Sequence, residues 1–224
     1  MATTTALTPQ QFVQELDAMV KGALDRIGAK SAAGGPAQGV TIATLLEVAL
    51  KNELEASEEA ALWMSTERDV EVKLALARQC GDEAKHYRLI EDRLRAHGVD
   101  PSKLDPLASG HTPMFEFLRG LEQTVERVAA GQFTREALAQ VRNDVFARWC
   151  DDHDDADTAK LYRDVIGPDE RHHHALGRKL LLRFATTIEA QDAARTAAKR
   201  TLELAEELQE IARLKKGIAC APGC

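Results

Sequence analysis

The sequence predicts an all-α protein: a four-helix bundle with one long crossover connection, extended by an additional helix at each end. Three observations lead to this prediction. Ala and Leu, both strong helix formers, make up more than a quarter of the 224 residues, whereas aromatic residues make up 4%. Apolar residues recur at intervals of three and four along most of the chain. One long segment with several prolines and glycines divides the central helices into two pairs.

The charge balance excludes one broad class of function. Asp and Glu number 36 against 29 Lys and Arg, which gives a formal net charge of −7 at pH 7. Such a chain has no excess of cations to displace the counterions of a nucleic acid, so we do not expect a nucleic-acid partner. The N-terminus has neither a basic start nor an apolar stretch, and no apolar run approaches the ~20 residues of a membrane span. We therefore expect a cytoplasmic protein without a membrane partner.

The first unit, residues 1–40, is predicted to be a helix followed by a linker. Apolar residues between Phe12 and Ile27 follow helical spacing, which predicts a helix over residues 9–27. The next residues, 28–39, are mostly small and show no periodicity. This helix is therefore expected to be an appendage to the domain that follows.

The bundle itself is predicted over residues 41–187. Its first pair of helices covers residues 41–66 and 69–98, because the helical pattern breaks only briefly between them. Asp69 can cap the N-terminus of the second helix, and Gly98 is a natural C-terminal stop. Such a short turn predicts an antiparallel hairpin.

A long connection, residues 98–113, joins the two pairs and contains three prolines and two glycines. A helix of about 28 residues spans ~42 Å, and about 16 extended residues reach ~53 Å. The connection is therefore long enough to run the full length of the bundle. That length favours a bundle with one crossover over a simple up-down bundle.

The second pair is predicted over residues 114–150 and 157–187, with a possible break at Gly131. Pro168 has no backbone N–H, so we expect it to kink or restart the second of these helices. A last amphipathic helix is predicted over residues 188–216.

The same short motif occurs in the second helix of each pair. It reads Glu83-x-x-His86 in the first pair and Glu170-x-x-His173 in the second, and both the Glu and the His are 87 positions apart. One Glu-x-x-His is common by chance in a chain with this much Glu. Two copies at matched positions indicate an internal duplication.

The spacing has a chemical reason. Residues three apart lie on one face of a helix, so a carboxylate and an imidazole can bind the same cation. Two such helices facing each other would supply two His residues and two bridging carboxylates, Glu83 and Glu170. Each pair's first helix must then add one more Glu at the same height. Carboxylates with imidazoles suit iron or manganese.

In the first helix of the bundle, the candidates for that additional ligand are Glu47, Glu53, Glu55, Glu58 and Glu59. Counting back through the turn near residue 67 places the required level around residues 49–53. Glu53 shares a face with small and apolar residues, whereas Glu55 points elsewhere. We therefore select Glu53.

In the third helix, the level opposite the second motif falls near residue 138 if the turn is centred at about residue 154. Glu136 is the only carboxylate close to that height and is our choice. Glu126 and Glu122 are the alternatives if a break at Gly131 shifts the helix.

Together these six residues resemble the ligand set of the ferritin-like di-iron carboxylate superfamily, over residues 41–187. Residues 157–174 are similar to the rubrerythrin-like branch, which includes the tRNA hydroxylase family. The resemblance implies a ferritin-like four-helix bundle with two metal ions, usually iron, that react with dioxygen or peroxide. No pair of Cys-x-x-Cys motifs is present, so the rubredoxin-type domain of typical rubrerythrins is missing. The acidic charge balance argues against a tRNA substrate.

Four further residues are candidates for supporting roles. Tyr87 and Tyr162 could act near an oxidising site as hydrogen-bond donors or radical relays, with core packing as the alternative. Asp82 and Asp169 precede the two motif glutamates and could hold a metal ligand through its free nitrogen or oxygen. Solvated helix-surface carboxylates are the alternative for these two.

The C-terminal unit, residues 188–224, ends in a tail that contains Cys220 and Cys224. Their spacing matches no established metal-site motif. We expect a mobile surface tail, with metal chelation or a disulfide as alternatives.

From these observations we predict a protein with two iron ions, or iron and manganese, that reacts with dioxygen or peroxide as an oxidoreductase of the oxygenase or peroxidase type. It would require a small-molecule substrate and an electron donor, neither of which the sequence names, and the additional apolar helices suggest a homodimer. Two alternatives remain. One is iron binding with ferroxidase, storage or detoxification activity and no organic substrate, and the other is a metal-free helical interaction module.

Overall fold

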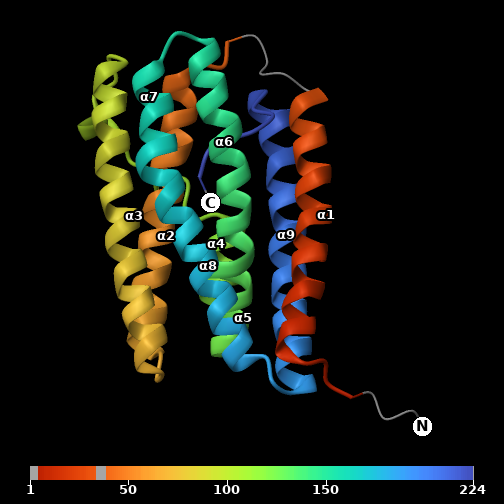
Figure 1. Cartoon of the computed structure of the whole chain (residues 1–224). Coiled ribbons are helices and arrows are strands. Elements are labelled where there is room, and N and C mark those ends of the chain that lie inside the picture. Colours follow the sequence, from red (N-terminus) through yellow and green to blue (C-terminus); the bar gives the residue numbers. More distant parts are fainter. Residues whose placement is uncertain (1–4, 34–38, 224) are drawn as a thin grey trace.

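A computed structural model describes residues 5–33 and 39–223, and every regular element within them is a helix (Figure 1). Four long helical segments form a bundle, and one additional helix from each end of the chain packs on its side. The predicted all-α bundle with one long crossover is therefore confirmed. None of the helices in the described part of the chain has the length and apolarity that a membrane span requires.

The first pair of the bundle is formed by α2 (Ile42–Thr66) and α3 (Val70–Ala96), joined by a turn of three residues. Thr41 caps α2 by accepting a hydrogen bond from the amide of Thr44 at 3.1 Å. Asp69 caps α3 as predicted, with its carboxylate 3.2 Å from the amide of Val72. Side-chain caps of this kind satisfy amides that the helix cannot, which fixes where each helix begins.

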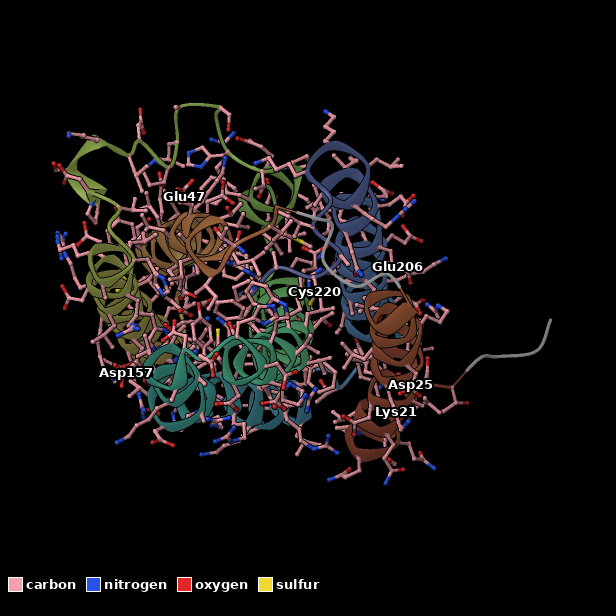
Figure 2. The ribbon with its side chains drawn as sticks, turned by 90° about the horizontal axis from the view of Figure 1, so that it is seen from above. Lys21, Asp25, Glu47, Asp157, Glu206 and Cys220 are labelled. Carbon is pink, nitrogen blue, oxygen red and sulfur yellow. The ribbon has the colours of Figure 1, made fainter. Side chains whose placement is uncertain are left out.

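The connection between the pairs runs back along α2. It contains a short 3₁₀ turn (Pro101–Lys103) and leads into α4 (Pro113–Arg119). Glu55 of α2 accepts hydrogen bonds from the amide and the hydroxyl of Thr112, at 2.7 and 2.6 Å. Lys51 donates to the carbonyl of Gly110 at 2.5 Å. These contacts hold the crossover on the outside of α2, where it is seen near Glu47 in Figure 2.

The third segment differs from the single helix predicted over residues 114–150. The helix that starts there, α4, ends at Gly120, and a new helix begins with α5 (Thr124–Val128). It continues through a π-helical stretch (Ala129–Arg135) into α6 (Glu136–Asp152). The possible break at Gly131 was therefore wrong, because residue 131 lies inside the continuous π-helical stretch. This glycine serves packing instead: a Cβ there would lie 2.7 Å from the Trp63 ring.

The fourth segment consists of α7 (Ala156–Leu161), a second π-helical stretch (Tyr162–Ile166) and α8 (Gly167–Phe184). The irregularity expected at Pro168 is present one residue before it, where the Gly167 amide bonds to the carbonyl of Tyr162 five residues back. Since proline cannot donate the next hydrogen bond of an α-helix, a wider turn there is a physical consequence of the sequence.

The additional helices, α1 (Pro9–Ala33) and α9 (Ile188–Lys216), lie side by side along the bundle (Figures 1 and 2). The first helix extends beyond Ile27, where it was predicted to end. An ion pair between Arg195 and Glu15 at 2.6 Å joins the two helices. Arg26 and Glu206 form a second one at 3.0 Å.

The core consists of two separate apolar clusters. One is built from α1, α4, α5, the first π-helical stretch, α8, α9 and the adjoining ends of α2, α3 and α6, and includes Trp63 and Phe133. The other fills the opposite end of the bundle and includes Leu46, Ile90 and Phe146. Between the two clusters, the inward faces of the four bundle segments carry Glu and His side chains.

The tail after α9 was expected to be a mobile surface segment, and for residues 217–223 that expectation is wrong. Gly217 adopts a left-handed conformation (φ 67°) that ends α9, and Ile218 then packs into the second apolar cluster. The chain turns back into the bundle (Figure 1), with Pro222 and Gly223 buried. Cys220 is half-buried, and Cys224 lies outside the described residues.

Candidate metal centre

Six acidic and imidazole side chains meet in the middle of the bundle, and none is more than 2% exposed. They come from all four segments: α2, α3, α6 and α8. They are the six residues that the sequence analysis selected as metal ligands: Glu53, Glu83, His86, Glu136, Glu170 and His173.

The six residues form two overlapping groups that could each hold a metal ion. One group contains Glu53 and His86, and the other contains Glu136 and His173. Both groups share the same two carboxylates, Glu83 and Glu170, and within each group the potential ligand atoms lie within 4.8 Å of one another. This sharing is the arrangement in which two carboxylates can bridge two ions.

Both imidazoles direct Nδ1 toward the carboxylates. The Nδ1 atom of His86 lies 3.1 Å from Glu83 Oε2 and 3.4 Å from Glu53 Oε2. The Nδ1 atom of His173 lies 3.6 Å from Glu83 Oε1 and 3.6 Å from Glu136 Oε2. One imidazole therefore stands at each end of the group, with the shared carboxylates between them.

The outward nitrogens of the two imidazoles are held by carboxylates of the opposite helix. His86 Nε2 lies 3.1 Å from Asp169 on α8, and His173 Nε2 lies 3.1 Å from Asp82 on α3. These two contacts are equivalent under the 87-residue repeat of the motifs. An aspartate in this position fixes the tautomer that leaves Nδ1 free to bind a cation. Asp82 and Asp169 thus contact the imidazoles as the sequence analysis suggested.

The burial of four carboxylates with two imidazoles strongly shifts their pKa values. Desolvation raises the pKa of Glu53 to about 7 and that of Glu136 to about 8, and it raises the pKa of Glu170 well above its usual range. Burial opposes the charged form of His86, but the close carboxylates of Glu53 and Glu83 raise its pKa to about 12. Burial also favours neutral Glu83, yet the hydrogen bond and positive charge of His86 lower its pKa to about 2.

Several buried polar atoms at the centre accept or donate no hydrogen bond within the described residues. Both carboxylate oxygens of Glu53 and the Nδ1 atom of His173 are among them. Such orphaned atoms cost free energy unless a ligand satisfies them. Atoms that can donate an electron pair, aimed at a shared point and left without a partner, fit a bound cation.

The two halves of the centre differ in their surroundings. Beside Glu136, Gln79 donates a hydrogen bond to its Oε1 at 2.6 Å and accepts one from Gln132 at 2.9 Å. Next to this pair of amides, Arg135 forms a buried ion pair with Glu59. The sequence analysis missed this polar network. A signal was present, since Gln79 lies one turn before Glu83 on the same helix face.

The two predicted tyrosines are placed differently. Tyr162 is fully buried, and burial together with the negative charges of Glu53 and Glu170 raises its pKa well above the ordinary value. Its hydroxyl makes no hydrogen bond to the described residues. Tyr87 is half-buried and lies against Glu91 and the Arg88 guanidinium, 5.5 Å from its ring.

The three carboxylates considered as the ligand from the third helix occupy different positions in the structure. Glu126 lies in the first turn of α5, where its carboxylate accepts a hydrogen bond from the Gln123 amide at 3.0 Å. Glu122 lies outside the helices, in the break that precedes α5. Glu136 is the one of the three that reaches His173.

An all-helical bundle with these buried Glu and His groups is compatible with a ferritin-like di-iron fold. Comparison with protein-family models, curated proteins and solved structures gave no match for this chain.

Proposed function

We propose that this chain is a dinuclear metal protein of the di-iron carboxylate type that reacts with dioxygen or peroxide as an oxidoreductase. The observation that carries the proposal is the burial of four carboxylates with two imidazoles at one point, with unsatisfied ligand atoms aimed inward. A protein interior tolerates so many acidic groups when cations neutralise them.

The donor set argues for iron, with manganese as a possible second metal. It contains only carboxylate oxygens and imidazole nitrogens, whereas thiolates would select zinc, Cu(I) or iron–sulfur clusters. In the proposed assignment, Glu53 and His86 would hold one ion, Glu136 and His173 would hold the other, and both ions would share Glu83 and Glu170. When bound, such a pair of redox-active ions supplies electron transfer to dioxygen or peroxide.

The remaining residues would prepare and protect this site. Asp169 and Asp82 hold the outward nitrogen of each imidazole and so aim Nδ1 at the ion, and Gln79 orients the Glu136 carboxylate by its hydrogen bond. The apolar clusters on both sides exclude bulk water. We also propose that the protein acts on a small-molecule substrate, takes electrons from an external donor and forms a homodimer. Of the two tyrosines, we propose Tyr162 as the one that acts beside the centre.

Metal analysis tests the proposal. Protein purified without metal and then loaded anaerobically with ferrous iron should bind about two ions per chain. A Glu83→Gln/Glu170→Gln variant should bind almost none, because it neutralises both bridging ligands. A Glu47→Gln/Glu71→Gln variant, which changes two exposed carboxylates, is the matched control and should keep the full iron content. If the bridging variant binds as much iron as the control, the assignment is wrong.

A second experiment separates the oxidoreductase from an iron-storage or ferroxidase function. Iron-loaded protein is supplied with dioxygen, or with peroxide, in the presence and absence of an electron donor. Repeated turnover with the donor, at a fixed iron content, supports the oxidoreductase. Uptake of many ions per chain into a large hollow assembly would favour storage instead. A centre that binds no metal would favour the helical interaction module.

A further inference from the structure

The segment Gly217–Gly223, here called the C-terminal strap, reaches the metal centre from outside the bundle. Its beginning is anchored: Ile218 is buried in the second apolar cluster, and Gln209 donates a hydrogen bond to the carbonyl of Ala219 at 2.9 Å. From there the chain passes Cys220, which lies inside the outline of the molecule in Figure 2. The beginning of the strap is therefore fixed to the second apolar cluster, and its far end is held by other contacts.

That far end is held by two asparagines from different helices. Asn52 of α2 donates a hydrogen bond to the carbonyl of Pro222 at 3.0 Å, and the amide of Gly223 donates one to Asn143 of α6 at 2.7 Å. Both are neutral hydrogen bonds; the one to Asn52 is partly buried and the one to Asn143 is buried. A neutral hydrogen bond of this kind adds only a small net free energy. The strap end is thus seated by specific contacts with two different helices.

Gly223 lies directly against the proposed metal ligand Glu53. A Cβ at Gly223 would lie 3.4 Å from Glu53 Oε1 and 3.1 Å from the Cβ of Asn52. The backbone at Gly223 also has φ +86°, which a glycine adopts without strain. The left-handed backbone and the short distance to Asn52 favour glycine at this position, and the glycine places the strap in contact with the Glu53 carboxylate.

On its outer side the strap borders open space. A groove of about 440 Å³ between α2, the crossover and α9 is lined by Asn52, Ile218 and Ala221, among others. A smaller cleft of about 160 Å³ is lined by Asn52 and Cys220. None of the six residues of the metal centre lines either space. The strap is therefore the layer between this groove and the Glu53 side of the centre.

We propose that the C-terminal strap is a removable plug, which closes the route from the groove beside α2 and α9 to the metal centre and is displaced to admit metal ions and a small-molecule substrate. The nature of the metal ions and the substrate that would enter rests on the proposed function. It adds a regulated access route on one specific side of the centre, the side of Glu53 and His86.

The test uses an Asn52→Ala/Asn143→Ala variant of the full chain, which removes both hydrogen bonds to the strap end. The matched control is Ser65→Ala/Asp144→Ala, with exposed positions on the same two helices. A second variant ends the chain after Ala219 and keeps the anchored part. Circular dichroism shows which variants are folded, and either one suffices for the measurement.

Two rates are measured. The first is extraction of bound ferrous iron by a water-soluble chelator, and the second is amidation of the Glu53 carboxyl by a water-soluble carbodiimide and a small amine in the metal-free protein, followed by peptide mass spectrometry. Loss of both hydrogen bonds should accelerate each rate about tenfold or more, while iron content at equilibrium stays at that of the control. Rates equal to those of the control in folded variants would overturn the plug.

The metal-free measurement keeps the two proposals separate. If the chain binds no iron, the proposed function fails, but the rate of Glu53 amidation still decides whether the strap closes the centre. If iron binds and neither rate changes, the strap proposal fails and the metal centre stands.

Discussion

At the scale of single residues, the most informative feature is the crossed pairing of imidazoles and aspartates. Each histidine is held by the aspartate that precedes the motif glutamate of the opposite helix. The aspartates are partly solvated, and each also contacts a cation: Lys85 for Asp169 and Arg78 for Asp82, both at 3.2 Å. The pairing ties α3 to α8 at the height of the centre and presents both Nδ1 atoms inward.

This pairing predicts the effect of removing one aspartate charge. Asp169→Asn should lower metal affinity about 10- to 100-fold, because the amide no longer fixes the tautomer and basicity of His86. Isothermal titration with ferrous or manganous ions under anaerobic conditions measures the change. Asp92→Asn, an exposed position on the same helix as His86, is the control and should bind like the wild type. If the Asp169→Asn variant bound metal with unaltered affinity, Asp169 would have no role in metal binding.

The residues of the centre were largely predictable from the sequence, and its surroundings were not. The duplicated Glu-x-x-His motifs fix two helix faces, and counting through short turns gives the heights of Glu53 and Glu136. The heights are insensitive to a few residues of error because a carboxylate side chain is long. The partners of Gln79 and Arg135 depend on side-chain packing between helices, which no periodicity in one segment encodes.

At the scale of elements, the two π-helical stretches distinguish this bundle from four regular helices. Both lie next to the centre, one immediately before Glu136 and one ending four residues before Glu170. A π turn adds one residue to a helix without changing its direction, so it rotates the residues that follow relative to those before it. Helical periodicity predicted the segments themselves but not these turns, because the apolar pattern tolerates one inserted residue. Pro168 was the one local signal.

Two glycines of the bundle predict opposite effects of alanine substitution on stability, because one lies at a helix contact and the other in open space. A Cβ at Gly177 of α8 would lie 2.7 Å from the backbone carbonyl carbon of Gln132, which is part of a π-helical stretch and cannot move freely. Gly177→Ala should therefore destabilise the fold by about 1–3 kcal/mol. Gly81→Ala, in open space on α3, should stabilise it by about 0.5–1 kcal/mol. Urea unfolding measures both free energies, and equal effects of the two substitutions would contradict the proposed close contact.

At the scale of the whole molecule, a charged layer separates two apolar clusters, and this layer makes the stability of the metal-free protein depend on pH. The folded state raises the pKa of Glu53 to about 7 and that of Glu136 to about 8, so it binds protons that the unfolded chain releases near its usual value of 4.5. Stability from these protons is present at acidic pH and is lost as pH rises through the folded values.

The pKa shifts of His86 and Glu83 affect stability in opposite pH ranges. For His86, with a pKa of about 12, stability is fully present below its usual value of 6.5 and declines as pH rises above it. For Glu83, with a pKa of about 2, stability is present above 4.5 and is lost as pH falls toward 2. The pKa of Glu170 is also raised, so within the centre the losses of stability on the alkaline side come from four groups and the loss on the acidic side from one.

The expected result is a metal-free protein whose melting temperature falls between about pH 5 and about pH 8. Metal-loaded protein should show a smaller fall or none, because bound cations replace the protons and metal binding releases them. Differential scanning calorimetry in buffers of constant ionic strength measures both curves. A metal-free protein that becomes more stable over this range would show that the buried carboxylates are already ionised and balanced by other charges.

The central claim is that two metal ions bind between the apolar clusters and share Glu83 and Glu170. Crystals of iron-loaded protein, measured by anomalous scattering on both sides of the iron absorption edge, test it most directly. The account predicts two peaks per chain, one beside Nδ1 of His86 and one beside Nδ1 of His173, each in contact with both shared carboxylates. Anomalous peaks found only at the protein surface, with none between the four carboxylates, would contradict it.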